Sequence, residues 1–426
     1  MSMIVALVFF AICLLGVGIG FAFGVAGMVG LWMSGLPIEM MASKMMFAVN
    51  SFPLLAIPFF MLAGELMVRG GIVTVAINFA NTLIGRVRGS IGHVTVVSGM
   101  GLASVSGAAV ADAAALGGAL MKPLGDSYNK PFGAALIAAT GNLGPILPPS
   151  TAMIVYATIA GPTLSLPALF IGGVLPAFLI AALMMLYVYL AARWHNFPLT
   201  GEPFKLAQVA RVGFRSLPVL MIPVIVIGGI MGGVFTATEG GAIAVVLALL
   251  LGFFFTRELK LADLPECLIN AAIATGVVAV IIAFASTVTF IFSIDHVPDM
   301  LRSVIEGMTS DPTIFLILIF LMLVVIGMFM ESTAAYVMLV PIFAPMAIAY
   351  GIEPLHFALV FILTLIVGML TPPVGVLLFV MMSISGLKMG PIVKEVWPYL
   401  LIQFGVTLAV LFLPDVFLFL PRLAGY

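Results

Sequence analysis

Charged side chains are scarce in this chain. Lysine, arginine, aspartate and glutamate together make up 8% of its 426 residues, whereas hydrophobic residues make up 63%. About a quarter of the residues in a soluble domain are charged, and the mean hydropathy here is +1.32. Residues 131–192 carry no charge at all, a length that accommodates two membrane spans of about 20 residues. This composition excludes a soluble globular protein and predicts a polytopic helical membrane protein.

Cysteine and histidine are too few to build most kinds of reactive site. Cys13 and Cys267 lie in separate apolar runs, so they predict neither a disulfide framework nor a metal motif. The four histidines have no metal-ligand spacing. HExxH and GxSxG motifs are also missing, which disfavours a membrane-embedded enzyme. A formal net charge of −1 gives no indication of a nucleic-acid partner.

Two apolar stretches are interrupted in the same way. Residues 140–150 read TGNLGPILPPS and residues 364–374 read TLIVGMLTPPV. Superposing the two Pro-Pro pairs also aligns a threonine pair and a glycine pair, which are Thr140 with Thr364 and Gly144 with Gly368. Because proline lacks a backbone donor, both segments are expected to unwind within the membrane. Bare backbone at that depth must face protein or a water-filled cavity, and such a doubled break is typical of a transporter binding site.

The distribution of charge predicts how the chain crosses the membrane. Basic residues gather in a few short loops, which the positive-inside rule places in the cytoplasm. The stretch 93–122 is flanked by basic residues on both sides, so we predict a re-entrant helical hairpin that enters from the cytoplasm. The stretch 311–353 is flanked by acidic residues and predicts a second hairpin that enters from outside. We therefore expect an all-α inverted repeat of hairpin and broken helix, with both termini outside.

The other apolar runs predict scaffold helices. They lie at 4–33, 51–68, 72–84, 166–192, 217–234, 240–255, 269–293 and 396–419. We expect a short interfacial helix at 37–46 and a basic linker at 193–215, and we interpret Gly16, Gly18 and Gly20 as helix-packing positions. The predicted division is scaffold at 1–90, first hairpin and broken helix at 91–160, scaffold and linker at 161–310, second hairpin and broken helix at 311–390, and a C-terminal helix at 391–426.

The tip of the first hairpin offers oxygen ligands for a cation. Residues 101–118 hold Ser104 and Ser106 among glycines, where a helix break exposes hydroxyl and carbonyl oxygens. Hard cations such as Na⁺ prefer ligands of this kind. Carbonyls of the facing break would complete the site, and the residues expected to supply them are Gly144, Leu147 and Pro149.

The repeat predicts a second cation site at the tip of the second hairpin. Its sequence there is Met330-Glu331-Ser332-Thr333. Ser332 and Thr333 are the candidate ligands on the hairpin. The second break is expected to contribute Gly368, Thr371 and Pro373.

Five polar or acidic residues are candidates for substrate contact. Asn142 and Ser150 border the first break, although a role in capping the freed backbone accounts for them equally well. An acid inside the membrane is costly and is a functional hypothesis by default, which singles out Glu331 and Asp112. Pairing within its own hairpin is an equal alternative for Asp112. Ser106 is assigned to both the substrate and the first cation.

Five motifs spread over nearly the whole chain occur together in one family. They are IPFFMLAGELM at 57–67, VADAAALG at 110–117, GPILPPS at 144–150, ESTAAYVMLVPIFAP at 331–345 and GMLTPPVG at 368–375. In these motifs the chain closely resembles the large membrane subunit, DctM type, of tripartite ATP-independent periplasmic (TRAP) transporters.

The resemblance implies a Na⁺-coupled importer of organic acids such as C4-dicarboxylates or sialic acid, located in the bacterial inner membrane. It implies an elevator mechanism, in which a domain of two hairpins and two broken helices moves against a fixed scaffold. It also implies two partners, a small four-helix membrane subunit and a periplasmic binding protein. By position, it implies Na⁺ ligands at the two tips and breaks described above.

The energy source and one alternative follow from other features. No GxxxxGK[ST] signature for ATP binding is present, which favours transport driven by an ion gradient. A stand-alone Na⁺/dicarboxylate or ion exchanger would share the two-hairpin architecture. Such an exchanger would need no binding protein. Whether transport depends on a binding protein therefore separates the two hypotheses.

Overall fold

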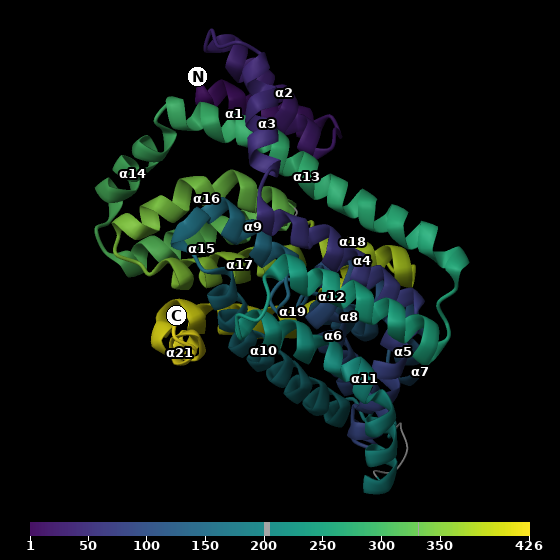
Figure 1. The fold of residues 1–426 in the computed structure, drawn as a ribbon. Coiled ribbons are helices and arrows are strands. Elements are labelled where there is room, and N and C mark those ends of the chain that lie inside the picture. Colours follow the sequence, from purple (N-terminus) through teal and green to yellow (C-terminus); the bar gives the residue numbers. More distant parts are fainter. Residues whose placement is uncertain (200–204, 331) are drawn as a thin grey trace.

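The computed structural model describes residues 1–199, 205–330 and 332–426 (Figure 1). Every regular element in these three ranges is a helix, which confirms the predicted all-α fold there. Eight helical segments are long and apolar enough to cross a membrane. They are Phe52–Arg69, Leu166–Trp194, Leu206–Met231, Ala237–Thr256, Leu261–Ile294, Pro312–Phe329, Ser332–Ala349 and Met389–Phe412.

The first apolar run forms two helices, so the single helix predicted at 4–33 is wrong. α1 (Ser2–Leu14) and α2 (Ile19–Met33) pack against each other. They are antiparallel, because the hydroxyl of Ser34 reaches back to the sulfur of Met1. Gly16 lies in the turn with φ of +82°, a conformation that glycine adopts without steric cost. Because Gly16 was interpreted as a helix-packing position, the turn was not predicted.

Small residues on α2 do serve packing farther along. α13 (Leu264–Ile294) is the longest helix of the described chain and lies along α2. A Cβ atom placed on Gly20, Gly24 or Gly27 would come within 3.0–3.1 Å of side chains on α13. The packing interpretation therefore holds for Gly20, since only glycine lets the two helices approach this closely.

Most other scaffold helices match the predicted runs. They are α3 (Glu39–Val49), α4 (Ala56–Arg69), α5 (Ile72–Ile84), α10 (Leu166–Trp194), α11 (Leu206–Met231) and α12 (Ala237–Leu250). A further helix, α14 (Val297–Met308), follows α13 and was not predicted. Figure 1 shows α1 to α3 with α13 at one end of the molecule and the lower parts of α10 and α11 at the other.

Two predicted boundaries are wrong. The linker predicted at 193–215 is shorter, because α10 continues to Trp194 and α11 already begins at Leu206. Both of its prolines precede position 204, and the arginines that follow are good helix formers. The last long helix, α19 (Met389–Phe412), ends before Pro414 and not near 419, because Leu413 leaves the helical conformation. The short helices α20 (Pro414–Phe417) and α21 (Phe419–Leu423) follow.

Each half of the chain contains a helix pair followed by a broken helix. The first set comprises α6 (Ser90–Ser106), α7 (Ala109–Ser127), α8 (Lys130–Gly141) and α9 (Thr151–Ala160). The second set comprises α15 (Pro312–Phe329), α16 (Ser332–Ala349), α17 (Pro354–Leu370) and α18 (Val376–Ser385). We call 142–150 the first break and 371–375 the second break. Both Pro-Pro bonds in the breaks are cis.

The two sets interlock. The second helix of each pair packs on the distal half of the other set's broken helix, so that α7 packs on α18 and α16 packs on α9.

α15 begins at an acidic cap, where the carboxylate of Asp311 accepts hydrogen bonds from the backbone N–H groups of Thr313 at 2.7 Å and Ile314 at 3.1 Å. These bonds hold the pKa of Asp311 below its usual range, with the Ile314 bond contributing most. The depth of either hairpin in the membrane stays a prediction, as does the side on which the termini lie.

Gly327 of α15 provides a test of this packing. A Cβ there would lie 2.8 Å from the carbonyl oxygen of Leu365 and 3.0 Å from the Cα of Gly368, both backbone atoms of α17. Gly327→Ala should therefore destabilise the protein by about 1–3 kcal/mol, the usual cost of overpacking. Thermal unfolding in detergent measures the change.

The matched control is Gly118→Ala in α7, where an added Cβ meets nothing within 4 Å. It should be neutral or stabilising by up to about 1 kcal/mol through helix propensity. Equal losses in both variants would contradict the close packing of α15 on α17.

Candidate functional site

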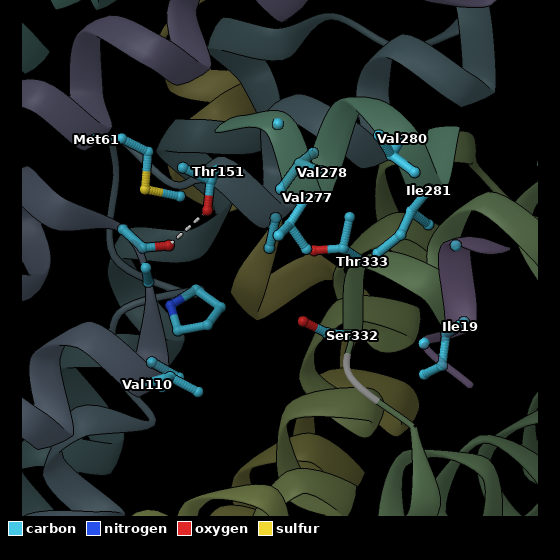
Figure 2. A pocket seen from close by; sticks show the side chains of 18 of the residues that line it. Ile19, Met61, Val110, Thr151, Val277, Val278, Val280, Ile281, Ser332 and Thr333 are labelled. Carbon is cyan, nitrogen blue, oxygen red and sulfur yellow. Dashed lines mark hydrogen bonds between the residues drawn. The ribbon is translucent and has the colours of Figure 1, made fainter. Parts of the chain in front are cut away.

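A cavity of about 670 Å³ lies between the two hairpin tips, next to the first break and the end of α17. The first set lines it from Gly107 to Val110 and with Pro145, Thr151 and Ala152, and the second set contributes Ser332, Thr333 and Met369. The scaffold contributes α2, Met61 of α4 and five residues of α13. Figure 2 shows Thr151 and Val110 on one side of the cavity and Ser332 and Thr333 on the other.

Helix N-termini surround this cavity. Its lining includes the first residues of α2, α7, α9 and α16. The unpaired N–H groups at a helix N-terminus carry a positive partial charge, which favours an anion. No acidic or basic side chain lines the cavity among the described residues. The arrangement is therefore suited to a small anion with substantial apolar surface.

The first hairpin tip is fixed to the first break. The hydroxyl of Thr151 donates to the carbonyl oxygen of Gly107 at 2.9 Å, as the dashed line in Figure 2 shows. Gly107 has φ of +61°, and a Cβ there would lie 2.5 Å from the Pro149 carbonyl oxygen. Gly144 comes equally close to the tip, because a Cβ on it would lie 2.4 Å from Oδ2 of Asp112. Glycine at both positions permits this contact.

Asp112 pairs within its own hairpin. The hydroxyl of Ser106 donates to Oδ1 of Asp112, and Asp112 is 1% exposed. Oδ2 of Asp112 has no hydrogen-bond partner in the described part of the chain. Ser106 and Asp112 line a second cavity of about 250 Å³, together with Glu65 and Asn270 of the scaffold. The hydrogen bond between Ser106 and Asp112 is the pairing within the hairpin that the sequence predicts as an alternative for Asp112. Substrate contact by either residue stays a prediction.

The first break offers unpaired carbonyl oxygens. Gly144, Leu147 and Pro149 are buried, and within the described ranges their carbonyls accept no hydrogen bond. Ser104 is also buried, but its hydroxyl donates to the Gly101 carbonyl of the preceding turn at 2.7 Å. Buried carbonyl oxygens that accept no hydrogen bond are the kind of ligand that a hard monovalent cation takes, and Gly144 also lies against the unpartnered Oδ2 of Asp112.

The second break is tied to its hairpin in a comparable way. The backbone N–H of Gly375 donates to the carbonyl of Met328 at 3.1 Å, and Gly368 lies directly against Gly327. The Gly368 carbonyl accepts a hydrogen bond from the backbone N–H of Thr371. The hydroxyl of Thr371 donates to the carbonyl oxygen of Val367. Pro373 lies in the same break. The structure thus brings Gly368 against α15, and a ligand role for Gly368, Thr371 and Pro373 stays a prediction.

The second tip is described only in part. Ser332 is buried, and both Ser332 and Thr333 line the large cavity. Glu331, the predicted acid at this tip, lies outside the described residues. In the described part of the chain no group of three or more histidine, cysteine, aspartate or glutamate side chains is placed to hold a metal ion.

Asn142 and Ser150 both bind backbone groups. The hydroxyl of Ser150 donates to the Pro145 carbonyl at 2.7 Å and accepts a bond from the N–H of Met153 at 3.2 Å, which caps α9. The side-chain nitrogen of Asn142 donates to the carbonyl of Ile366 and to Oε1 of Gln403. Neither residue is among those that line the large cavity. The capping alternative describes the contacts of Ser150, whereas the side chain of Asn142 links the end of α8 to α17 and α19. Substrate contact by either residue stays a prediction.

Sequence reasoning missed several residues of this region. Thr151 follows a serine at the start of a helix, and that cap pattern was the available signal for it. Gln403 was detectable as an uncharged polar residue inside an apolar helix. The lining residues of α13, such as Val277 and Ile281, gave no signal, because apolar side chains are expected throughout a membrane helix.

The Thr151 to Gly107 bond predicts how firmly the first tip is held. Thr151→Val keeps the shape of the side chain but removes the hydroxyl donor. Loss of this hydrogen bond should lower the free energy needed to open the tip by about 1 kcal/mol. The tip should then open roughly fivefold more often. Hydrogen exchange of the backbone amides at 105–110 measures this change.

Thr158→Val is the matched control, since the Thr158 hydroxyl bonds only to Ile154 within α9. It should leave exchange at 105–110 unchanged, and Thr151→Ser should restore protection of the tip. Unaltered exchange in Thr151→Val would mean that the tip is held by other contacts.

The fold is shared with a solved transporter structure. The crystal structure of the YdaH transporter from Alcanivorax borkumensis matches with a TM-score of 0.66, and the match covers 89% of each chain. The sequences are only 13% identical, so this likeness concerns the fold alone.

Comparisons of sequence identify the family. YgiK of Salmonella typhimurium, named an uncharacterized protein, is 36% identical over 97% of this chain and 96% of its own length. The sialic acid TRAP transporter large permease protein SiaM of Vibrio cholerae is 34% identical over 91% of each chain. The C4-dicarboxylate TRAP transporter large permease protein DctM of Pseudomonas aeruginosa is 33% identical over 91% of this chain and 90% of its own.

The family model described as the DctM component of the tripartite ATP-independent periplasmic transporter matches residues 6–416. A match of this extent covers both hairpins, both breaks and the scaffold helices around the cavity. The chain is therefore a multi-pass membrane protein that belongs to the DctM family of TRAP transporter large permease subunits.

Proposed function

We propose that this chain is the large permease subunit of a Na⁺-coupled importer of organic acids. Large permeases of this family work with a small membrane subunit and a periplasmic binding protein, and they are transporters rather than enzymes. The observation that carries the proposal is the cavity between the two hairpin tips, which four helix N-termini surround. The carboxylate of a substrate would be stabilised there by the partial charges of these helix ends.

The names of the relatives favour an organic acid. They include permeases for C4-dicarboxylates, sialic acid, 2,3-diketo-L-gulonate and isethionate. Each of these substrates combines an acid group with a carbon skeleton, which suits an apolar cavity with positively polarised rims. Thr151, Ser332 and Thr333 are the described side chains with hydroxyl groups in its lining. We propose that they bind the polar groups of the substrate.

Na⁺ is proposed as the coupling ion at the first tip. Support comes from the buried carbonyls of Gly144, Leu147 and Pro149, which accept no hydrogen bond in the described ranges, and from Oδ2 of Asp112 beside Gly144. A bound cation would offset the cost of a buried carboxylate in this region. A second ion is proposed at the second break, because the N–H of Gly375 in this break donates to the carbonyl of Met328 shortly before the second tip.

An elevator movement is proposed for the two sets of hairpin and broken helix. In this proposal α6 to α9 and α15 to α18 move together, because α7 packs on α18 and α16 on α9. The scaffold side of the cavity is formed by α2, α4 and α13. Movement along α13 would carry the cavity from one side of the membrane to the other. The inverted orientation of the two sets is part of the same proposal.

Reconstitution tests the proposed function. The chain is incorporated into liposomes with a TRAP small subunit, and uptake of labelled C4-dicarboxylate and sialic acid is measured. Uptake should require both an inward Na⁺ gradient and the matching binding protein. Uptake that needs Na⁺ but no binding protein would instead indicate a stand-alone exchanger, and uptake that ignores Na⁺ would refute the proposed coupling.

A single charge tests whether the cavity binds anions. Val110 lines the cavity and is 39% exposed. Val110→Asp places a carboxylate within reach of the substrate. At about 6 Å and an effective dielectric constant of about 20, the repulsion is roughly 3 kcal/mol. The KM for the organic acid should therefore rise roughly a hundredfold.

Val110→Asn is the control of the same shape without the charge. It should keep a KM close to that of the unsubstituted protein in the same uptake assay. If the two variants lose uptake equally, polarity or shape at position 110 matters and the charge does not.

A further inference from the structure

The side chain of Asn142 joins the two halves of the chain. Its nitrogen donates to the Ile366 carbonyl at 2.9 Å and to Oε1 of Gln403 at 2.7 Å. Gln403 in turn donates to the Ala139 carbonyl at 3.2 Å. Asn142 is 0% exposed and Gln403 is 1% exposed. One buried amide therefore connects the end of α8 with α17 and, through Gln403, with α19.

The two residues in the first of these bonds occupy equivalent positions in the two broken helices. Superposing Pro148-Pro149 on Pro372-Pro373 requires a shift of 224 residues, and Asn142 and Ile366 are separated by the same 224 residues. In a two-fold arrangement, a residue that contacts its own equivalent lies on the axis. The Asn142 bond therefore marks the place where a pseudo-two-fold axis between the broken helices would pass.

Each of these two residues also lies close to a proposed cation site. Asn142 precedes Gly144 by two positions, and Ile366 precedes Gly368 by two positions. The Asn142 bond therefore joins backbone next to one break directly to the residue that precedes the other. This bond lies in a buried environment, where an unmade hydrogen bond is costly and the two partners tend to move together.

We propose that Asn142 is a positioning residue that couples the two breaks, so that ordering of one break favours ordering of the other. The part of this inference that concerns ions rests on the proposed Na⁺ coupling. Such a coupling makes the binding of a cation at one tip raise the affinity at the other, which is measured as cooperativity. This role replaces direct substrate contact, since Asn142 is not part of the cavity lining.

The first test is structural and needs no ion. Asn142→Leu removes both hydrogen bonds made by this side chain, and Gln403→Met removes one of them with less disturbance of packing. Hydrogen exchange is measured on the full chain in detergent without Na⁺, in peptides that cover 364–378. Exchange there should rise roughly fivefold in Asn142→Leu and less in Gln403→Met.

His356→Leu is the matched control. The ring of His356 bonds to the Val410 carbonyl at 2.9 Å, so this variant also loses a buried link between α17 and α19, but far along the helix from the break. Exchange at 364–378 should stay at the level of the unsubstituted protein. Unchanged exchange in both Asn142→Leu and Gln403→Met, or an equal rise in His356→Leu, would overturn the inference.

The second test measures the dependence of uptake on Na⁺ concentration. The Hill coefficient should fall from above 1 in the unsubstituted protein towards 1 in Asn142→Leu, fall less in Gln403→Met, which keeps the bond to Ile366, and stay unchanged in His356→Leu. An unchanged coefficient in the first two variants would overturn the coupling of the ion sites. Uptake by the unsubstituted protein without any response to Na⁺ would refute the proposed function, and the exchange measurement would then decide the link between the breaks alone.

Discussion

The need to satisfy every backbone polar group away from water governs this structure. A helix meets that need by itself, but a Pro-Pro pair interrupts the helix and leaves carbonyls and N–H groups without partners. Nearby groups supply some of these partners. The hydroxyl of Ser150 donates to the Pro145 carbonyl of the first break and accepts the N–H of Met153, and in the second break the N–H of Gly375 donates to the carbonyl of Met328. The hairpins lie close because the broken backbone has to be enclosed by protein.

Glycine makes this enclosure possible. Gly107 and Gly144 let the first break approach its hairpin, and Gly327 and Gly368 do the same for the second. A side chain at any of these positions would separate backbone segments that now lie in contact. The carbonyls of the first break that accept no hydrogen bond in the described ranges are then the ones left available inside the enclosure. Structural necessity and the proposed ion chemistry thus use the same few residues.

The sequence predicted the broken helices and the helix pairs well, because proline and glycine determine backbone geometry directly. The antiparallel pair α1 and α2 escaped prediction, since glycine in a membrane helix signals packing as often as a turn. The contact between Asn142 and Gln403 joins residues far apart in the chain. No local pattern contains such information.

The apolar lining contributed by α13 has a mechanical consequence. Gly276, Val277, Val278, Val280 and Ile281 offer the cavity no side-chain hydrogen-bonding group. A surface of this kind makes only dispersion contacts, which change little as one body slides past another. A polar surface would instead form hydrogen bonds with its neighbour in particular positions. Each movement would then have to break one set of hydrogen bonds before the next set forms. In the proposed elevator movement, this part of α13 would therefore let the neighbouring helices slide past it without breaking side-chain hydrogen bonds.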